Sequence, residues 1–184
     1  MFLSSKHFLL LASAICGLIF SMSAQTNFIS NGGFESMNTC PTGFSNLGQS
    51  YWTRPNNHTG SPDFYNSCAS AWFVGVPVNW GGTTAAAAGT GYCGSYQLWS
   101  TTGREYISDT LTAPLVAGVQ YVVSFQYILS PACRLASDDL GFLLTVAHPS
   151  VVGSGTIGTP TSQNPSGNYL TNQTSWATYS DTII

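Results

Sequence analysis

The sequence has 184 residues and few charges, with four Lys or Arg against seven Asp or Glu and a formal net charge of −3. This acidic balance argues against a nucleic acid as the partner, because such binding needs clustered basic side chains. Aromatic residues make up 13% of the chain, which is enough to build a hydrophobic core, so the low charge does not indicate disorder.

The N-terminus has the pattern of a cleavable signal peptide. A single lysine precedes the apolar run of residues 8–20, which is too short for a membrane helix of roughly 20 residues but suits the apolar region of a signal. The small residues at 21–24 offer a cleavage site, so we expect the mature chain to begin at Ala24 or Gln25. After cleavage the sequence contains no predicted membrane span.

A lipoprotein signal built on Cys16 is the competing interpretation. It is disfavoured because Ile15 stands where a small residue should precede the lipidated cysteine. We therefore assign residues 1–24 to the signal and residues 25–184 to one exported domain. That domain has three arginines against seven acidic residues, a net charge of −4.

Apolar and polar residues alternate along the rest of the chain with a period of two, which predicts β-strands rather than helices. The clearest case is residues 119–129, where the apolar side chains share one face. In chain order, the predicted strands are residues 28–30, 51–53, 72–76, 91–100, 104–112, 119–129, 140–146 and 176–184. The segments predicted to be loops include residues 54–67, 85–88 and 153–172.

A pattern of many short strands separated by polar loops favours an all-β fold, and we predict an antiparallel β-sandwich of jelly-roll type. The sequence stops at residues 181–184, part-way through a predicted strand. We therefore expect the last strand or strands of the jelly roll to be missing.

Four cysteines remain after removal of the signal, and an even number in an exported domain predicts disulfide bonds. They are Cys40, Cys68, Cys93 and Cys133. Of the three possible pairings we favour Cys40 with Cys68 and Cys93 with Cys133. A zinc site is disfavoured by the wide spacing of these cysteines and the absence of a CxxC motif.

Several ordered motifs resemble one family of bacterial surface proteins. The segment Asn31-Gly32-Gly33-Phe34-Glu35 resembles the opening of carbohydrate-binding-module-like, galactose-binding-like jelly rolls. Further matching stretches are residues 40–43, Trp52 with Pro55, residues 63–68, 74–77 with Asn79, 104–107, 114–115 with Gly118, 138–141 and 164–168. Together they resemble the N-terminal domain of gliding-motility-associated or outer-membrane-protein-A-tailed cell-surface proteins.

This resemblance implies a jelly-roll module that is exported to the cell surface, the outer membrane or the medium, with further domains downstream. Some features depart from the family pattern. Cys93 and Cys133 are not positions that belong to it, residues 82–91 are unusually rich in alanine, and the aspartate pair that usually ends the closing strand is absent.

The resemblance also implies a structural calcium ion held by Glu35, backbone carbonyls and an aspartate, for which Asp139 is the candidate. Calcium takes six to eight oxygen ligands, which loops can supply. The alternative is that Glu35 accepts hydrogen bonds within a turn. Asp138 and Asp139 are adjacent at a predicted strand start, so only one of them can join a given site.

Aromatic side chains beside polar loops suggest a carbohydrate-binding surface, because the C–H faces of sugar rings pack on aromatic planes while polar groups bind the hydroxyls. The candidate ligand-binding residues are Trp52, Arg54, Asn56, Trp72, Tyr96 and Trp99. The expected partner is a polysaccharide or a cell-surface glycan. The alternative for each aromatic residue is core packing or loop anchoring.

Catalysis finds little support in the sequence, because neither His58 nor His148 adjoins a recognisable nucleophile motif. We expect a non-catalytic module, with a structural spacer domain as the alternative. A glycoside-hydrolase-like enzyme that uses Glu35 and Glu105 is the second alternative. Arg104 and Glu105 are adjacent, so we expect each to bond to a different neighbouring segment rather than to each other.

Overall fold

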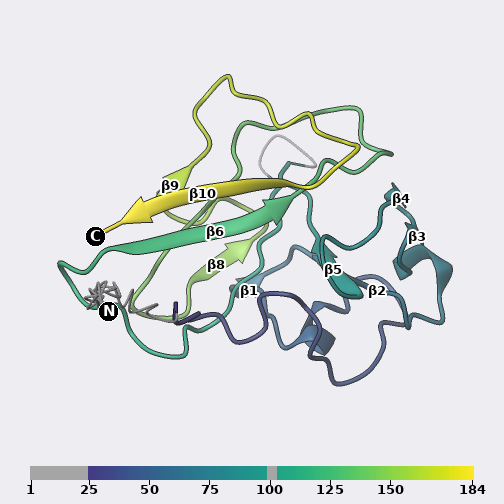
Figure 1. Ribbon diagram of the computed structural model, residues 1–184, viewed down its shortest axis with the longest axis horizontal. Coiled ribbons are helices and arrows are strands. Elements are labelled where there is room, and N and C mark those ends of the chain that lie inside the picture. The colour runs from purple at the N-terminus through teal and green to yellow at the C-terminus, as the bar shows by residue number, and fades with distance from the viewer. Residues whose placement is uncertain (1–24, 99–102) are drawn as a thin grey trace, which may run out of the picture.

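The computed structural model describes residues 25–98 and 103–184 and is built from short β-strands with two 3-10 turns. The all-β class is thereby confirmed (Figure 1). The elements are η1 (Leu47–Ser50), β1 (Asn56–His58), β2 (Asp63–Asn66), η2 (Trp72–Val74), β3 (Val78–Asn79), β4 (Gly82–Thr83), β5 (Gly91–Gly94), β6 (Tyr121–Tyr127), β7 (Gly141–Phe142), β8 (Ser150–Gly153), β9 (Ser162–Gln163) and β10 (Ala177–Ile183). Within the described residues the ten strands pair two by two, into five small sheets.

The longest pairing joins β6 and β10, which run antiparallel along their whole length as the two long arrows of Figure 1. Half-buried and exposed residues alternate along both strands, as the period-two pattern predicts. Opposite each other in the register, Phe125 and Tyr179 stack with ring centroids 4.9 Å apart. The predicted strands at residues 119–129 and 176–184 are confirmed, each a little shorter than expected.

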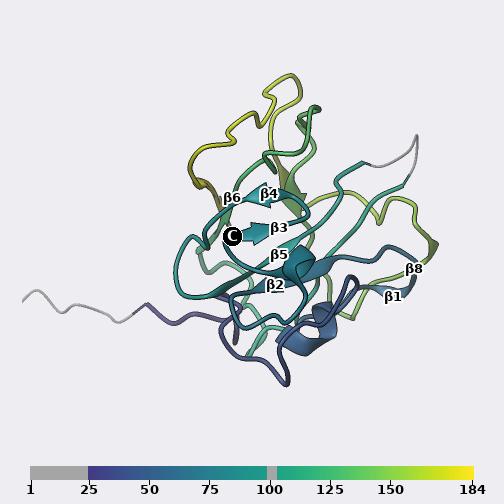
Figure 2. The ribbon, with the colours of Figure 1, turned by 90° about the vertical axis from the view of Figure 1, so that its right-hand side faces the viewer.

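The buried hydrophobic side chains lie in and around β2, which pairs antiparallel with β5 (Figure 2). The side chains of Phe64 in β2 and Val74 in η2 are fully buried, and Leu47 of η1 joins them. Tyr65 of β2 stacks on Tyr92 of β5 at 5.2 Å. This cluster positions η1 and the chain that follows it.

Strands β1 and β8 pair in parallel, and the register shifts between Asn56 and His58. Asn57, between them, has φ 59, a left-handed conformation that asparagine tolerates better than most residues. The irregularity places His58 inside, at 3% exposure, while Asn56 and Asn57 remain exposed.

Several predicted strands differ from the structure, because local alternation gave no information about their distant partners. Residues 72–76 contain the 3-10 turn η2, residues 28–30 form no strand, and residues 104–112 contribute only a bridge from Ser108 to Thr53. Two other strands are shorter than predicted, at β5 and β7. The predicted loop at residues 54–67 contains β1 and β2, and the loop at residues 153–172 contains β9, whereas residues 85–88 lie outside any strand, as predicted.

The predicted signal, residues 1–24, and the candidate Trp99 lie outside the described residues. Across residues 25–98 and 103–184, no helix has the length and apolar character needed to cross a membrane.

Candidate functional site

A surface groove with a volume of about 530 Å³ lies beside η1 and β1. Its lining comes from η1, the segment that leads into β1, the residues just before β2 and one residue before β8. The lining residues are Ser45, Leu47, Gly48, Trp52, Thr53, Arg54, Asn56, Ser61, Pro62 and His148. Three of the predicted ligand-binding residues, Trp52, Arg54 and Asn56, therefore meet in one place.

Trp52 is held rigidly in the groove wall. Its indole Nε1 donates a hydrogen bond of 2.8 Å to the carbonyl of Asn31. Its ring stacks on Phe34 with centroids 5.2 Å apart. The side-chain amide of Asn31 in turn donates to the carbonyls of Ser36 and Ser50. The Asn31 turn thus serves as the support for a fixed aromatic wall.

His148 reaches the groove through a cross-strand pair that the sequence analysis did not anticipate. Thr53 and Ser108 exchange backbone hydrogen bonds of 2.9 and 2.7 Å across the chain. Both hydroxyl oxygens then lie within 3.2 Å of His148 Nε2. No signal in the sequence near His148 could have indicated this position, because its partners are 40 and 95 residues away.

Arg54 is oriented by the turn that follows β1. Its Nη1 donates to the carbonyl of Gly60 at 2.8 Å, and the Gly60 N–H donates to Nδ1 of His58 at 3.0 Å. Burial and the nearby Arg54 charge lower the pKa of His58, although Glu105 acts in the opposite direction. A neutral imidazole is what the Gly60 N–H requires, since the acceptor nitrogen must carry no proton.

Two carboxylates fix serines of the groove wall. Glu105, only 7% exposed, accepts hydrogen bonds from Ser61 N and Oγ and from the backbone N–H of Tyr96. Asp63 accepts from the backbone N–H of Ser45 at 2.7 Å. Burial raises the pKa of Asp63, and Glu105 adds to this, while the bond from Ser45 acts in the opposite direction. These acids shape the wall without being part of its lining.

A second feature is an exposed aromatic surface formed by Phe44, Trp72, Phe73 and Trp80. Trp72 and Trp80 are 64% and 62% exposed. The Phe44 ring lies 4.9 Å from Phe73 and 6.2 Å from Trp80, and Trp72 lies 5.9 Å from Phe73. Trp72 therefore belongs to this surface and not to the groove lining, and Tyr96 is exposed outside the lining as well.

The two proposed calcium residues are engaged with different partners. Glu35 Oε1 accepts from the N–H groups of Thr90 and Gly91, and Oε2 accepts from the Thr90 hydroxyl. Asp139 pairs with Arg104 at 3.2 Å. Within residues 25–98 and 103–184, no three His, Cys, Asp or Glu side chains gather as metal ligands. In this structure Glu35 accepts hydrogen bonds and Asp139 pairs with an arginine, and calcium stays a prediction from the resemblance.

Arg104 and Glu105 bond to different segments, as their adjacency predicted. Arg104 contacts Asp139, and Glu105 contacts Ser61 and Tyr96. Glu35 and Glu105, the alternative catalytic pair, likewise have separate sets of partners. Both carboxylates of that pair are occupied by hydrogen-bond donors.

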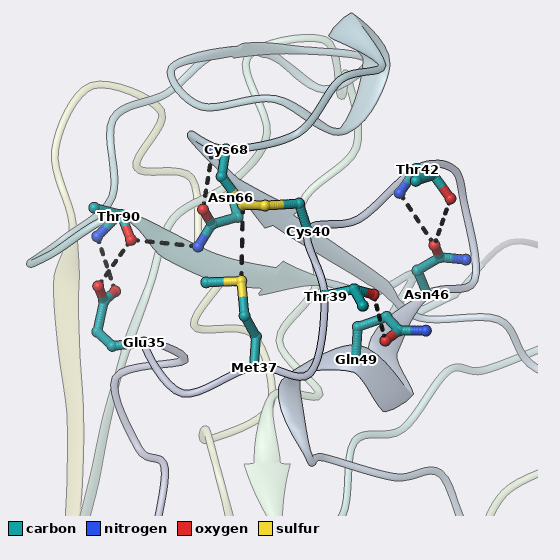
Figure 3. The surroundings of a disulfide bond; sticks show 10 residues. All are labelled: Glu35, Met37, Thr39, Cys40, Thr42, Asn46, Gln49, Asn66, Cys68 and Thr90. Carbon is teal, nitrogen blue, oxygen red and sulfur yellow. Dashed lines mark hydrogen bonds between the residues drawn. A yellow bond between two sulfur atoms is a disulfide. The ribbon is translucent and has the colours of Figure 1, made fainter.

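The predicted bridge between Cys40 and Cys68 is present, with Cα atoms 5.6 Å apart (Figure 3). The predicted bridge between Cys93 and Cys133 is not formed, and both thiols are free. Cys93 is held opposite Phe64 in the β2–β5 register. Cys133 lies in the turn after β6, where its Sγ is 3.2 Å from the Leu135 carbonyl oxygen. The two cysteines are therefore held by different segments and do not bond to each other.

No protein-family model, curated protein or solved structure matches the chain significantly.

Proposed function

We propose that this chain is an exported, non-catalytic jelly-roll module that binds carbohydrate through the groove at Trp52, Arg54 and Asn56. The observation that carries the proposal is the meeting of these three residues in one depression of about 530 Å³. A fixed aromatic wall beside amide, guanidinium and hydroxyl groups matches the chemistry of a sugar, which has apolar C–H faces and polar edges.

Export to the cell surface or the medium is supported by the signal-like residues 1–24 and by the Cys40–Cys68 bridge, which suits an oxidising compartment. The jelly-roll arrangement is supported by the family resemblance and by the predominance of antiparallel pairs. Long loops that carry the binding residues between short strands are also typical of such modules.

A glycan array probed with the purified chain tests the proposal. We expect binding to at least one polysaccharide and a loss of that binding in Asn56→Ala. This variant is suitable because the Asn56 side chain is exposed and makes no hydrogen bond within the described residues. Trp52→Phe should also weaken binding. This variant retains a ring on Phe34 but loses the hydrogen bond from Nε1 to the Asn31 carbonyl, which holds the aromatic wall in place.

Trp72→Ala is the matched control, because Trp72 is exposed and lies outside the groove lining. If Trp72→Ala abolishes binding while Asn56→Ala does not, the aromatic surface is the site and the groove is not. If no glycan binds at all, carbohydrate binding is wrong and a structural spacer becomes the better interpretation.

A further inference from the structure

We propose that the groove selects glycans that carry carboxylate groups, such as uronic-acid polymers, with the Arg54 guanidinium as the group that binds the carboxylate. This inference rests on the proposed carbohydrate function and adds a ligand class to it. It depends on two features of the groove and one of the whole domain. In the groove, a hydrogen bond orients Arg54 and the lining has no acidic side chain; the domain as a whole has a negative net charge.

Arg54 presents a guanidinium that is oriented but not neutralised. It is exposed, and within the described residues its single hydrogen bond runs from Nη1 to the Gly60 carbonyl. The turn that supplies this carbonyl is itself tied to the buried His58. Because the bond holds one nitrogen, the guanidinium plane is restrained while Nη2 and Nε remain as donors. Two parallel N–H donors on one edge match the two oxygens of a carboxylate.

The groove lining contains Arg54 and His148 but no Asp or Glu. In residues 25–98 and 103–184, the ion pair within 4.0 Å joins Arg104 to Asp139, so Arg54 has no carboxylate partner there. The nearby acids Asp63 and Glu105 are bonded to Ser45 and Ser61, lie outside the lining and form no ion pair with Arg54. A carboxylate on the ligand would therefore be the direct ion-pair partner that Arg54 lacks within the described residues.

The domain as a whole does not favour polyanions, because residues 25–184 carry three arginines against seven acidic residues. General electrostatic attraction is thus not expected. Binding of an acidic glycan has to come from local hydrogen bonding at Arg54, which makes the inference sensitive to a single substitution. Arg134 provides a matched control, since it is exposed and lies outside the groove lining.

The first experiment compares polygalacturonate and alginate with their carboxyl-reduced, neutral forms in titrations of the purified chain. We expect at least one acidic polymer to bind about tenfold or more tightly than its reduced form, as two charge-assisted hydrogen bonds would give. Equal affinity for the acidic and reduced forms would overturn the inference and leave carbohydrate binding intact. Binding only to neutral glycans on the array would do the same.

The second experiment uses variants. Arg54→Gln should abolish the preference for the acidic form, Arg54→Lys should retain only part of it because a single ammonium cannot form the bidentate pair, and Arg134→Gln should leave it unchanged. Circular dichroism checks that each variant is folded. If the preference for the acidic polymer survives Arg54→Gln, or if dextran sulfate binds as tightly as that polymer, the assignment to Arg54 and to carboxylates is wrong. Nonspecific attraction of polyanions would then explain the binding. Absence of any glycan binding would refute the proposed function itself.

Discussion

Removal of the Cys40–Cys68 bridge should have its main effect on the groove. The bridge closes a loop with a sequence separation of 28 residues. Every lining residue of the groove except His148 lies inside that loop. The chain-entropy model gives about 3.5 kcal/mol of stabilisation for a loop of this length. We therefore expect Cys40→Ala with Cys68→Ala to lower the free energy of unfolding by about 3 to 4 kcal/mol.

The assay is urea unfolding of the oxidised chain, the reduced chain and the double variant, with glycan titration in parallel. Reductant should destabilise the original chain and leave the double variant unchanged, and groove binding should weaken in both bridge-free forms. Cys133→Ser is the control, because Cys133 is a free thiol whose loss breaks no bridge. A loss of less than about 1 kcal/mol on removal of the bridge would contradict the loop-closure reasoning.

Three further predictions concern residues outside the groove. Glu35→Gln should lower the free energy of unfolding by about 1 to 2 kcal/mol at pH 7. Burial opposes, but the hydrogen bonds from Thr90 and Gly91 lower the pKa of Glu35, so this difference should shrink as the pH falls through the folded-state pKa. A difference of the same size at acid pH would show that these bonds to the carboxylate are not its cause. Burial raises the pKa of the Cys93 thiol to about 12, so iodoacetamide at pH 8 should modify Cys133 but not Cys93. Mass spectrometry measures the labelling of each cysteine, and equal labelling would refute this prediction. Phe64→Ala should cost about 3 to 5 kcal/mol in urea unfolding, because that side chain is completely buried, and a loss below about 1 kcal/mol would show the core to lie elsewhere.

Calcium offers a separate check on the resemblance. The structure leads us to expect that EDTA and added calcium leave the melting temperature unchanged, since both Glu35 oxygens already accept hydrogen bonds. A calcium-dependent rise in the melting temperature that disappears in Glu35→Gln would instead support the metal site implied by the family.

The sequence was informative where the relevant signal is local. A strand as long as β6 alternates over seven residues, so its half-buried face could be assigned from the pattern alone. The shortest strands, such as β3, β4 and β9, have two residues each and carry no measurable period. Residues 72–76 have the composition of a strand, yet residues 72–74 form a 3-10 turn that buries Val74 in the core. Packing in the tertiary structure therefore outweighed the strand propensity of this segment.

The aromatic and polar composition of the Trp52 to Asn56 segment was enough to identify it as a candidate site, because residue chemistry is written directly in the sequence. The even cysteine count predicted disulfide bonds but left three pairings open. The favoured Cys40–Cys68 pairing is present, whereas Cys93 and Cys133 are free, because the positions of their segments depend on the fold.

Only the tertiary structure decided how the groove is assembled. The bridge between Thr53 and Ser108 and the parallel pairing of β1 with β8 bring in His148, and the buried His58 orients Arg54 through Gly60. Such non-local pairings have no local sequence signal, since they depend on the register between segments that are far apart in the chain. The sequence thus determined which chemical groups are present, and the fold determined which of them share a surface.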